Sequence, residues 1–337
     1  MPAQLGSCAG ITFVHKRQKD PHPVTLLTAL TFTLRTHTDF SPCAHANPSA
    51  GPPPCACPTG TLADRPDATV VRHAGTVAKA HAPGTPPEAL LPRLRTAARL
   101  PEVFLPPLTP APALLHDRLV TFWPYGTPVD PEAPEEAPWE AAGALLARLH
   151  RAAPPPDLPP MRGPAKAAQA VARLAAVTHP ATIPVRRAWH RLPAWARAEA
   201  PMPAAGLCHG DLHLGQLVRA PAGDWRLIDV DDLGTGVQTW DLARPAAWYA
   251  CGLLPPEEWN RFLTAYRDAD GPALDGYDDP WPALDVAARA LTVQTAARAI
   301  TKSAQQRRQL DEVEEALVDA CARMGAVPPG QVTSDPP

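Results

Sequence analysis

The chain has 337 residues, of which 45% are hydrophobic and 19% are charged, and its formal net charge at pH 7 is -3. This composition is typical of a globular protein, and the near balance of acidic and basic residues argues against a nucleic-acid partner. No run of about 18 or more apolar residues occurs, so we expect no membrane-spanning segment and a cytoplasmic protein.

Residues 1–58 are expected to be a disordered or non-native extension, because they lack sustained periodicity and end in a proline-rich stretch. The apolar run Val24–Leu34 follows basic residues, as in a secretory signal. Its threonines and its distance from the small-residue site at 44–46 argue against that function. A zinc site is not expected either, because the candidate ligands have unusual spacings and aperiodic flanks. These candidates are Cys43, His45, Cys55 and Cys57.

Residues 59–124 are expected to form a small, β-rich N-terminal lobe. Alternating apolar residues in ATVVR and TVAKAH predict two strands around a tight turn. A helix with leucines on one face follows, and then a strand that leads into the breaker WPYG. The expected bounds are 68–72 and 76–81 for the first two strands, 87–100 for the helix and 117–122 for the third strand.

Residues 125–326 are expected to form a larger, mostly helical lobe, and residues 327–337 a disordered tail. The clearest helix begins just after a proline and places its alanines and leucines on one stripe. Two short apolar runs, Leu217-Val218 and Trp225–Ile228, flank a turn-rich connector and predict a β-hairpin. The expected helices are 139–152, 165–177, 186–199, 238–251, 255–268, 284–305 and 308–324.

The segment CHGDLHLGQL, residues 208–217, contains the main candidates for chemistry. The predicted hairpin brings Gln216 opposite Asp229, and Asp211 lies on the loop that leads into it. In phosphoryl transfer, an aspartate accepts the proton of the substrate hydroxyl while an amide and a second aspartate hold magnesium. Asp211 and Gln216 have the spacing of D-x-x-x-x-N in kinase catalytic loops, with Gln in place of Asn. A glutamine carbonyl also supplies the oxygen that magnesium prefers.

Lys79, flanked by apolar residues in TVAKAH, resembles the strand lysine of V-A-I-K that pairs with nucleotide phosphates. Glu88, at the start of the next helix, is its expected partner. The segment from Phe122 to Tyr125 links the lobes and is expected to offer backbone groups to an adenine edge. No G-x-G-x-x-G loop is present, and we expect the turn at 61–68 to cover the phosphates without glycines.

Two alternative functions remain open at this point. A metal-dependent hydrolase would use His209, Asp211 and His213 as ligands, with an aspartate at 229, 231 or 232 as a bridge or base. No histidine follows His213, and such an enzyme does not require Lys79. A non-catalytic, kinase-like nucleotide-binding protein is consistent with Gln216 and with the missing glycine-rich loop.

The segments HGDLHLGQL, LIDVDDLG and TWDLARPAAWYA together resemble the aminoglycoside phosphotransferase and choline kinase-like family of small-molecule kinases, over about residues 60–325. LLARLH, at 145–150, is similar to the helix that precedes the catalytic loop in that family. The resemblance implies an α+β, protein-kinase-like fold with two lobes. It also implies ATP and magnesium as cofactors, and a small molecule with a hydroxyl group as the acceptor.

The same resemblance assigns roles by position. Asp211 becomes the catalytic base, and Gln216 and Asp229 become the magnesium ligands. Lys79 contacts phosphates, Asp241 braces the catalytic loop, and His209 supports that loop. Neither His213 nor Asp231 receives a firm role, and each is expected to brace the site. The HLGQ form is similar to that of the sugar-directed maltokinase branch, so Gln216 indicates a subgroup of the family.

The acceptor is expected between the catalytic loop and the C-terminal helices. The sequence around Trp281 is acidic and has several aromatic neighbours, which favours a cationic acceptor such as an aminoglycoside or an amino alcohol. A sugar or other neutral polyol is equally compatible, and a solvated loop beside core tryptophans is the structural alternative. The acidic residues are Asp268, Asp270, Asp275, Asp278, Asp279 and Asp285, and the aromatic ones are Trp240, Trp248, Tyr249 and Trp259.

Overall fold

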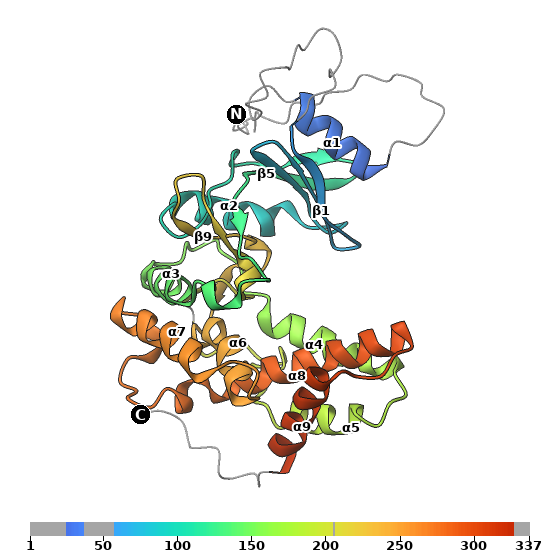
Figure 1. Ribbon diagram of the computed structural model, residues 1–337, viewed down its shortest axis with the longest axis vertical. Coiled ribbons are helices and arrows are strands. Elements are labelled where there is room, and N and C mark those ends of the chain that lie inside the picture. Colours follow the sequence, from blue (N-terminus) through green and yellow to red (C-terminus); the bar gives the residue numbers. More distant parts are fainter. Residues whose placement is uncertain (1–24, 37–56, 205, 327–337) are drawn as a thin grey trace, which may run out of the picture.

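The computed structural model describes residues 25–36, 57–204 and 206–326. A β-sheet forms one end of the molecule and a group of helices forms the other, with short strands between them (Figure 1). Within the described residues, no helix is both long enough and apolar enough to cross a membrane.

The N-terminal sheet has five antiparallel strands in the order β1-β2-β3-β5-β4. The predicted strands and the turn between them are confirmed, and β1 and β4 were missed. In the register, Val70 pairs with Lys79 and Lys79 with Thr121, so these side chains share one face of the sheet. The bounds are β1 Thr59–Arg65, β2 Ala68–His73, β3 Thr76–Ala80, β4 Ala113–Leu115 and β5 Arg118–Pro124.

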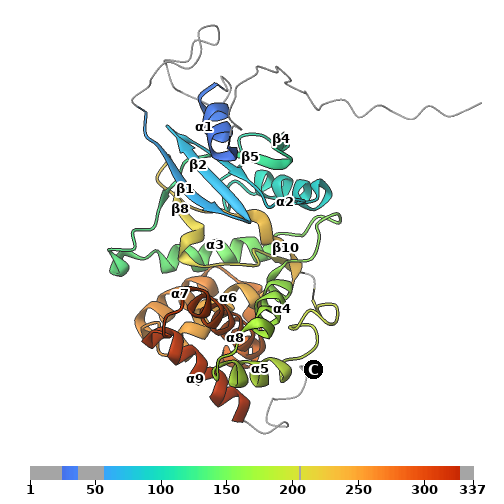
Figure 2. The same cartoon turned by 90° about the vertical axis from the view of Figure 1, so that its right-hand side faces the viewer.

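Helix α1, Leu26–Thr36, covers the face of this sheet opposite Lys79 (Figures 1 and 2). Leu30 and Leu34 are fully buried there, one helical turn apart, in a cluster that includes Phe122. The expectation of disorder for 1–58 is therefore wrong for residues 26–36. Their apolar residues repeat at helical spacing, and the leucines are buried against the N-terminal sheet. Cys43, His45 and Cys55 lie outside the described residues.

Helix α2, Pro87–Arg99, connects the sheet to the rest of the molecule. Leu90 and Leu94 enter the largest hydrophobic cluster, which extends into the helical end. The buried Arg93 donates a hydrogen bond from Nε to the carbonyl of Leu233, at 2.7 Å. The helix is thus fixed to the segment that follows Asp229.

Two short sheets and the turns between their strands hold the predicted catalytic segment. The hairpin of β8, Leu217–Arg219, and β9, Trp225–Leu227, is confirmed, with Leu217 opposite Leu227. Strand β6, Thr127–Pro128, extends this sheet, and β7, Gly206–Cys208, pairs with β10, Gly234–Gly236. These pairings bring the loop after β7 and the loop after β9 side by side.

The helical end is built around α3 and α8. Helix α3 packs on α7, while α8 packs against α4, α5, α6 and α9. Helix α5 ends at His190, short of the predicted residue 199, because Pro193 interrupts the helical hydrogen bonding. The bounds are α3 Trp139–Arg151, α4 Gly163–Arg173, α5 Thr182–His190, α6 Thr239–Ala250, α7 Pro256–Asp268, α8 Trp281–Gln306 and α9 Glu312–Ala326.

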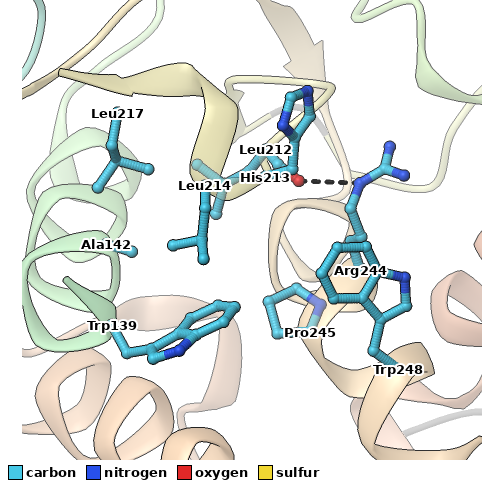
Figure 3. Close-up of a pocket in the computed structure, with 9 residues that line it drawn as sticks. All are labelled: Trp139, Ala142, Leu212, His213, Leu214, Leu217, Arg244, Pro245 and Trp248. Atoms are coloured by element: carbon cyan, nitrogen blue, oxygen red, sulfur yellow. Dashed lines mark hydrogen bonds between the residues drawn. The ribbon is translucent and has the colours of Figure 1, made fainter. Parts of the chain in front are cut away.

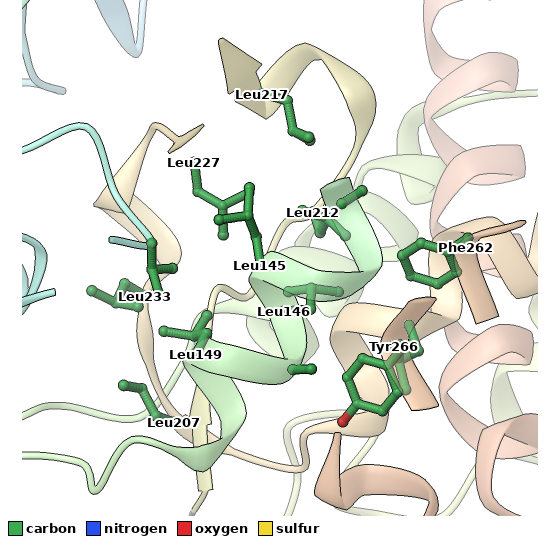
Figure 4. Packing of buried hydrophobic residues seen from close by; sticks show 14 of the residues in the cluster. Leu145, Leu146, Leu149, Leu207, Leu212, Leu217, Leu227, Leu233, Phe262 and Tyr266 are labelled. Carbon is green, nitrogen blue, oxygen red and sulfur yellow. The ribbon is translucent and has the colours of Figure 1, made fainter. Parts of the chain in front are cut away.

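Helix α3 lies at the centre of the largest hydrophobic cluster (Figure 4). Leu145 and Leu149 face the strands and loops around Leu227 and Leu233, while Phe262 and Tyr266 of α7 pack from the other side. The predicted stripe of this helix is thereby confirmed as core. Because the catalytic loop packs on the same helix through Leu212, the core fixes the position of the loop.

Close packing of α3 on α7 generates a stability prediction. A Cβ at Gly143 would lie 2.4 Å from the carbonyl oxygen of Phe262 and 2.9 Å from the amide nitrogen of Tyr266. We expect Gly143→Ala to lower the free energy of unfolding by about 1–3 kcal/mol, since overpacking outweighs the gain in helix propensity. Urea unfolding measures this, with Gly75→Ala as the control because nothing lies within 4 Å of its added Cβ. Equal stability of the two variants would contradict this account of the helix contact.

Candidate active site

The catalytic segment depends on two backbone features. Gly210 has a φ of 87°, and a Cβ there would lie 2.4 Å from the carbonyl oxygen of Asp232, so the loop requires glycine at this point. Asp229 has a φ of 64°, and its carboxylate accepts a hydrogen bond from the amide of Asp231 at 3.3 Å. An aspartate tolerates this left-handed conformation through such local bonding. The two loops thus meet at residues 210 and 232.

Asp241, at the start of α6, is buried beneath the catalytic loop with 1% of its surface exposed. Its two oxygens accept hydrogen bonds from the amides of His209, at 2.6 Å, and Gly210, at 2.7 Å. His150 Nε2 lies 3.1 Å from the same carboxylate, and its Nδ1 lies 2.8 Å from the hydroxyl of Tyr266. These contacts fix the backbone just before Asp211.

His209 contacts the protein through both ring nitrogens. Nε2 donates to the carbonyl of Ile228, at 2.9 Å, and Nδ1 accepts from the amide of Asp211, at 3.4 Å. The ring also stacks on Phe104. His209 therefore joins the catalytic loop to strand β9 and has no free nitrogen lone pair for a metal.

Asp211 is held by cations from two different helices. Its Oδ2 lies 2.7 Å from Nζ of Lys166 on α4, and its Oδ1 lies 2.5 Å from a guanidinium nitrogen of Arg244 on α6. Burial alone would raise the pKa of the carboxyl, but Lys166 and Arg244 outweigh it and hold that pKa well below its usual range. Asp211 is thus a fully ionised carboxylate at neutral pH.

Lys166 also lies 2.5 Å from Asp232, so one ammonium group serves two carboxylates. Asp232 is buried, and its Oδ1 has no hydrogen-bond partner within the described chain, with Arg162 3.8 Å away. Burial raises the pKa of Asp232, and the neighbouring carboxylates of Asp211 and Asp229 add to this effect against the attraction of Lys166. Lys166 is therefore the cation that Asp211 and Asp232 share, and its charge offsets the repulsion between the two carboxylates.

Lys79 reaches the other pair of carboxylates. Its Nζ lies 2.6 Å from Asp229 and 2.9 Å from Asp231, although Lys79 and Asp229 are 150 residues apart in sequence. Burial lowers the pKa of Lys79, but the two carboxylates outweigh it and raise that pKa above its usual value. His81 Nδ1 lies 2.9 Å from Oδ1 of Asp231, the carboxylate oxygen that Lys79 does not contact. The strand lysine therefore connects the sheet to the catalytic segment.

The remaining predicted nucleotide contacts lie in different surroundings. Glu88 is exposed on the first turn of α2, and Lys79 pairs with Asp229 and Asp231 rather than with it. Phe122 is buried under α1, and its carbonyl accepts a hydrogen bond from Leu108. The amide of Tyr125 donates to Gly75, and Arg72 covers the tyrosine ring at 3.3 Å. Roles of Glu88, Phe122 and Tyr125 in binding a nucleotide stay predictions.

Gln216 and Asp229 lie next to one another on the hairpin, where the amide of Ile228 donates to the carbonyl of Gln216. The Gln216 side chain is buried, with no hydrogen bond to another described residue, and Asp229 uses Oδ1 for its contacts. These oxygen donors fit magnesium by their chemistry. In the described part of the chain, no group of three or more His, Cys, Asp or Glu side chains is arranged as a metal site.

A small pocket, partly open to solvent, lies beside the catalytic loop (Figure 3). Trp139, Leu214 and Trp248 form apolar walls, and Arg244 donates from Nε to the carbonyl of Leu212, at 3.0 Å. His213 lies above the pocket. Burial and the charge of Arg244 lower the pKa of His213 to about 4, and its Nδ1 accepts from the amide of Gly215, so the ring is neutral at pH 7.

Sequence reasoning missed three residues of this site that contact its carboxylates, which are Lys166, Arg244 and His81. Arg244 follows Asp241 by three residues, a spacing that places both on one helix face and that was a usable signal. His81 follows Lys79 by two residues near the end of the same strand, which was a weaker signal. Lys166 lies in an alanine-rich helix with nothing in the sequence to connect it to Asp211.

Comparison with known proteins identifies a family and several solved structures to which this chain is similar. The sequence model of the phosphotransferase enzyme family matches residues 66–285, and a search of curated proteins found no match. A choline/ethanolamine kinase family protein from Mesorhizobium loti has a TM-score of 0.56 and 16% identity, with 81% of this chain and 90% of that chain covered.

Two further solved structures are similar. Spectinomycin phosphotransferase APH(9)-Ia, in complex with ADP and spectinomycin, has a TM-score of 0.51 and 12% identity, covering 79% of this chain and 92% of that one. Choline kinase LicA from Streptococcus pneumoniae has a TM-score of 0.51 and 12% identity, covering 80% and 93%. The expected α+β, kinase-like two-lobed fold is thereby confirmed.

The shared ammonium group of Lys166 generates a second prediction. Lys166→Met leaves Asp211 and Asp232 without their common cation, so we expect the free energy of unfolding to fall by about 1–3 kcal/mol. Urea unfolding at pH 7 measures the change. Lys302→Met is the control, because Lys302 is exposed on α8 and forms no ion pair with another described residue. Wild-type stability in Lys166→Met would show that the two carboxylates do not depend on this lysine.

Proposed function

Since the chain belongs to the phosphotransferase enzyme family, we propose that it transfers the terminal phosphoryl group of ATP, with magnesium, to a hydroxyl group of a small molecule. The chain is a phosphotransferase of small-molecule hydroxyls by family, whereas ATP, magnesium and the residue roles are parts of the proposal. The observation that carries it is the contact between Lys79 of the sheet and Asp229 of the catalytic segment, 2.6 Å apart.

That contact brings together the components that phosphoryl transfer requires. A strand lysine and a segment with an aspartate and an amide meet at the boundary between the sheet and the helices. In kinases, such a lysine pairs with nucleotide phosphates, and an aspartate with an amide holds the metal. The ADP complex of the similar spectinomycin phosphotransferase supports the choice of an adenine nucleotide.

The ligands of magnesium in this proposal are Asp229 and Gln216. Gln216 directly precedes β8 and Asp229 lies two residues beyond the end of β9, so the hairpin places both residues at one end. Magnesium, when bound, neutralises charge on the nucleotide phosphates. With a nucleotide bound, Lys79 would supply its positive charge to a phosphate oxygen, as the strand lysine of kinases does.

Asp211 orients the acceptor hydroxyl and takes its proton as the new bond to phosphorus forms. Each carboxylate oxygen has two lone pairs, so Oδ1 and Oδ2 keep the capacity to accept a hydrogen bond beside Arg244 and Lys166. Because these cations lower the pKa of Asp211, the carboxylate is a weak base. The carboxylate therefore orients the hydroxyl first and takes its proton late in the reaction, when the bond to phosphorus has made the hydroxyl more acidic.

Other residues keep this carboxylate in place. Asp241 holds the backbone at His209 and Gly210, and His209 ties the loop to β9. The hydrolase alternative needs His209 as a metal ligand, and both of its ring nitrogens serve the scaffold instead. Aminoglycosides, amino alcohols and sugars all offer a hydroxyl group to Asp211, and the proposed function covers each of these classes.

Replacement of Asp211 tests the proposal. We expect Asp211→Asn to lower turnover by roughly 10²- to 10⁴-fold, because a neutral amide cannot take the proton and loses its attraction for Lys166 and Arg244. The assay follows ADP formation with ATP and magnesium over a panel of aminoglycosides, amino alcohols, sugars and sugar acids.

The control is Asp224→Asn, because Asp224 is exposed in the turn between β8 and β9. Circular dichroism and thermal unfolding verify that both variants are folded. Turnover of Asp211→Asn within about threefold of the wild type would remove Asp211 from its assigned role, since a positioned base contributes far more.

A further inference from the structure

The strand lysine of this site has carboxylate partners other than the one that kinases use. In protein kinases, a glutamate on the helix after the lysine strand pairs with that lysine. Here Glu88 is exposed on the first turn of α2. Nζ of Lys79 lies instead 2.6 Å from Oδ1 of Asp229 and 2.9 Å from Oδ2 of Asp231. Two aspartates of the catalytic segment thus take the place of the helix glutamate.

These two aspartates differ in their other contacts. Asp229 is a magnesium ligand in the proposed function, and its Oδ1 also accepts a hydrogen bond from the amide of Asp231. Asp231 contacts Lys79 with one carboxylate oxygen and directs the other toward His81. Because both oxygens of Asp231 face side chains of the sheet, Asp231 is the partner that can stay with Lys79 when Asp229 binds the metal.

His81 holds the second oxygen of Asp231. The histidine is 1% exposed, and its Nδ1 lies 2.9 Å from Oδ1 of Asp231. Both atoms are buried, and neither forms a hydrogen bond with any other residue in the described part of the chain. A buried carboxylate oxygen requires a polar neighbour, and the imidazole supplies it. The position of the Asp231 carboxylate therefore depends on this ring.

The ring of His81 is itself anchored in the sheet. Its Nε2 lies 2.9 Å from Oγ1 of Thr121, which accepts a hydrogen bond from Nε1 of Trp123, also at 2.9 Å. With the ring hydrogen on Nδ1, the threonine hydroxyl donates to Nε2 and Nδ1 presents its hydrogen to the carboxylate. The backbone amide of His81 donates to the carbonyl of Leu119, at 2.8 Å. Backbone and ring are therefore both held by strand β5.

Lys79 and His81 come from one end of β3, two residues apart, so their side chains leave the sheet on the same face. Thr121 pairs with Lys79 in the register and shares that face. The sheet thus carries the lysine and its histidine support as one unit. Asp231 docks on this unit from the catalytic segment and contacts both side chains.

We propose that His81 and Asp231 are positioning residues for Lys79, and that they hold its ammonium group where the phosphates of the nucleotide bind. The inference rests on the proposed function and assigns to Asp231 the part that the helix glutamate has in kinases. His81 acts through Asp231, and Asp231 acts through Lys79. Adenosine has no phosphates, so its binding does not depend on where Lys79 lies.

Calorimetric titration of the full chain with ADP and with adenosine tests the proposal, each with magnesium and again with EDTA. His81→Gln removes the contact at Nδ1, and we expect it to weaken ADP binding about five- to tenfold and to leave adenosine binding unchanged. His81→Asn is expected to bind ADP within about twofold of the wild type, because the asparagine amide reaches the place of Nδ1. The matched control is His73→Gln, which removes a buried imidazole from β2 of the same sheet and is expected to change neither affinity.

Asp231→Asn gives an independent readout with a definite sign. Removal of a negative charge beside the phosphates would by itself strengthen ADP binding, whereas loss of the lysine's position weakens it. We expect ADP binding to weaken by about tenfold or more, with magnesium and with EDTA alike. This variant keeps the imidazole in place, so it tests the proposal even where His81→Gln does not fold.

The inference is overturned if His81→Gln and Asp231→Asn bind ADP as tightly as His73→Gln or more tightly. It is also overturned if His81→Asn loses as much ADP affinity as His81→Gln, or if adenosine affinity falls in parallel in the folded variants. A loss in Asp231→Asn that appears only with magnesium would make Asp231 a metal ligand instead. Failure of the proposed function is distinct, because the wild-type chain would then bind no ADP under either condition.

Discussion

Charge compensation among four neighbouring aspartates is the constraint on which this site depends. They are Asp211, Asp229, Asp231 and Asp232, and all lie within 22 residues of sequence. Such a group is unstable unless cations reach it, and these come from three distant elements. Lys79 arrives from the sheet, Lys166 from α4 and Arg244 from α6. The ion pairs of Lys79 also join the sheet to the helical end, so one residue both compensates these charges and connects the two ends of the molecule.

The backbone around these charges is held by Gly210, by the carboxylate of Asp241 and by helix α3. Gly210 permits the contact with residue 232, and the buried carboxylate of Asp241 accepts hydrogen bonds from the two consecutive amides that precede Asp211. Helix α3 supports the loop through the largest hydrophobic cluster. The backbone that carries the charged groups is thereby held by the core, and the ion pairs keep their side chains at short distances from one another.

Local sequence patterns predicted much of this arrangement. The hairpin around Gln216 and Asp229 and the sheet that carries Lys79 follow from alternation and turn residues, which are local properties. Lys166 was not predictable, because its contact with Asp211 arises from packing between elements 45 residues apart. Helix α1 was missed because its leucines lie between segments without periodicity. Lys79 was expected to pair with Glu88, yet the ion pairs formed by Lys79 come from the catalytic segment, since α2 turns Glu88 toward solvent.

Thermal unfolding with ATP, with magnesium and with both together tests the central claim most directly. A ligand at about 100 times its dissociation constant adds about 2.7 kcal/mol to the free energy of unfolding. The account predicts a rise of several degrees that requires both ATP and magnesium in the wild type and is lost in Asp229→Asn. An equal rise with ATP alone, or no rise under any condition, would contradict the assignment of Asp229 and Lys79 to a nucleotide and metal site.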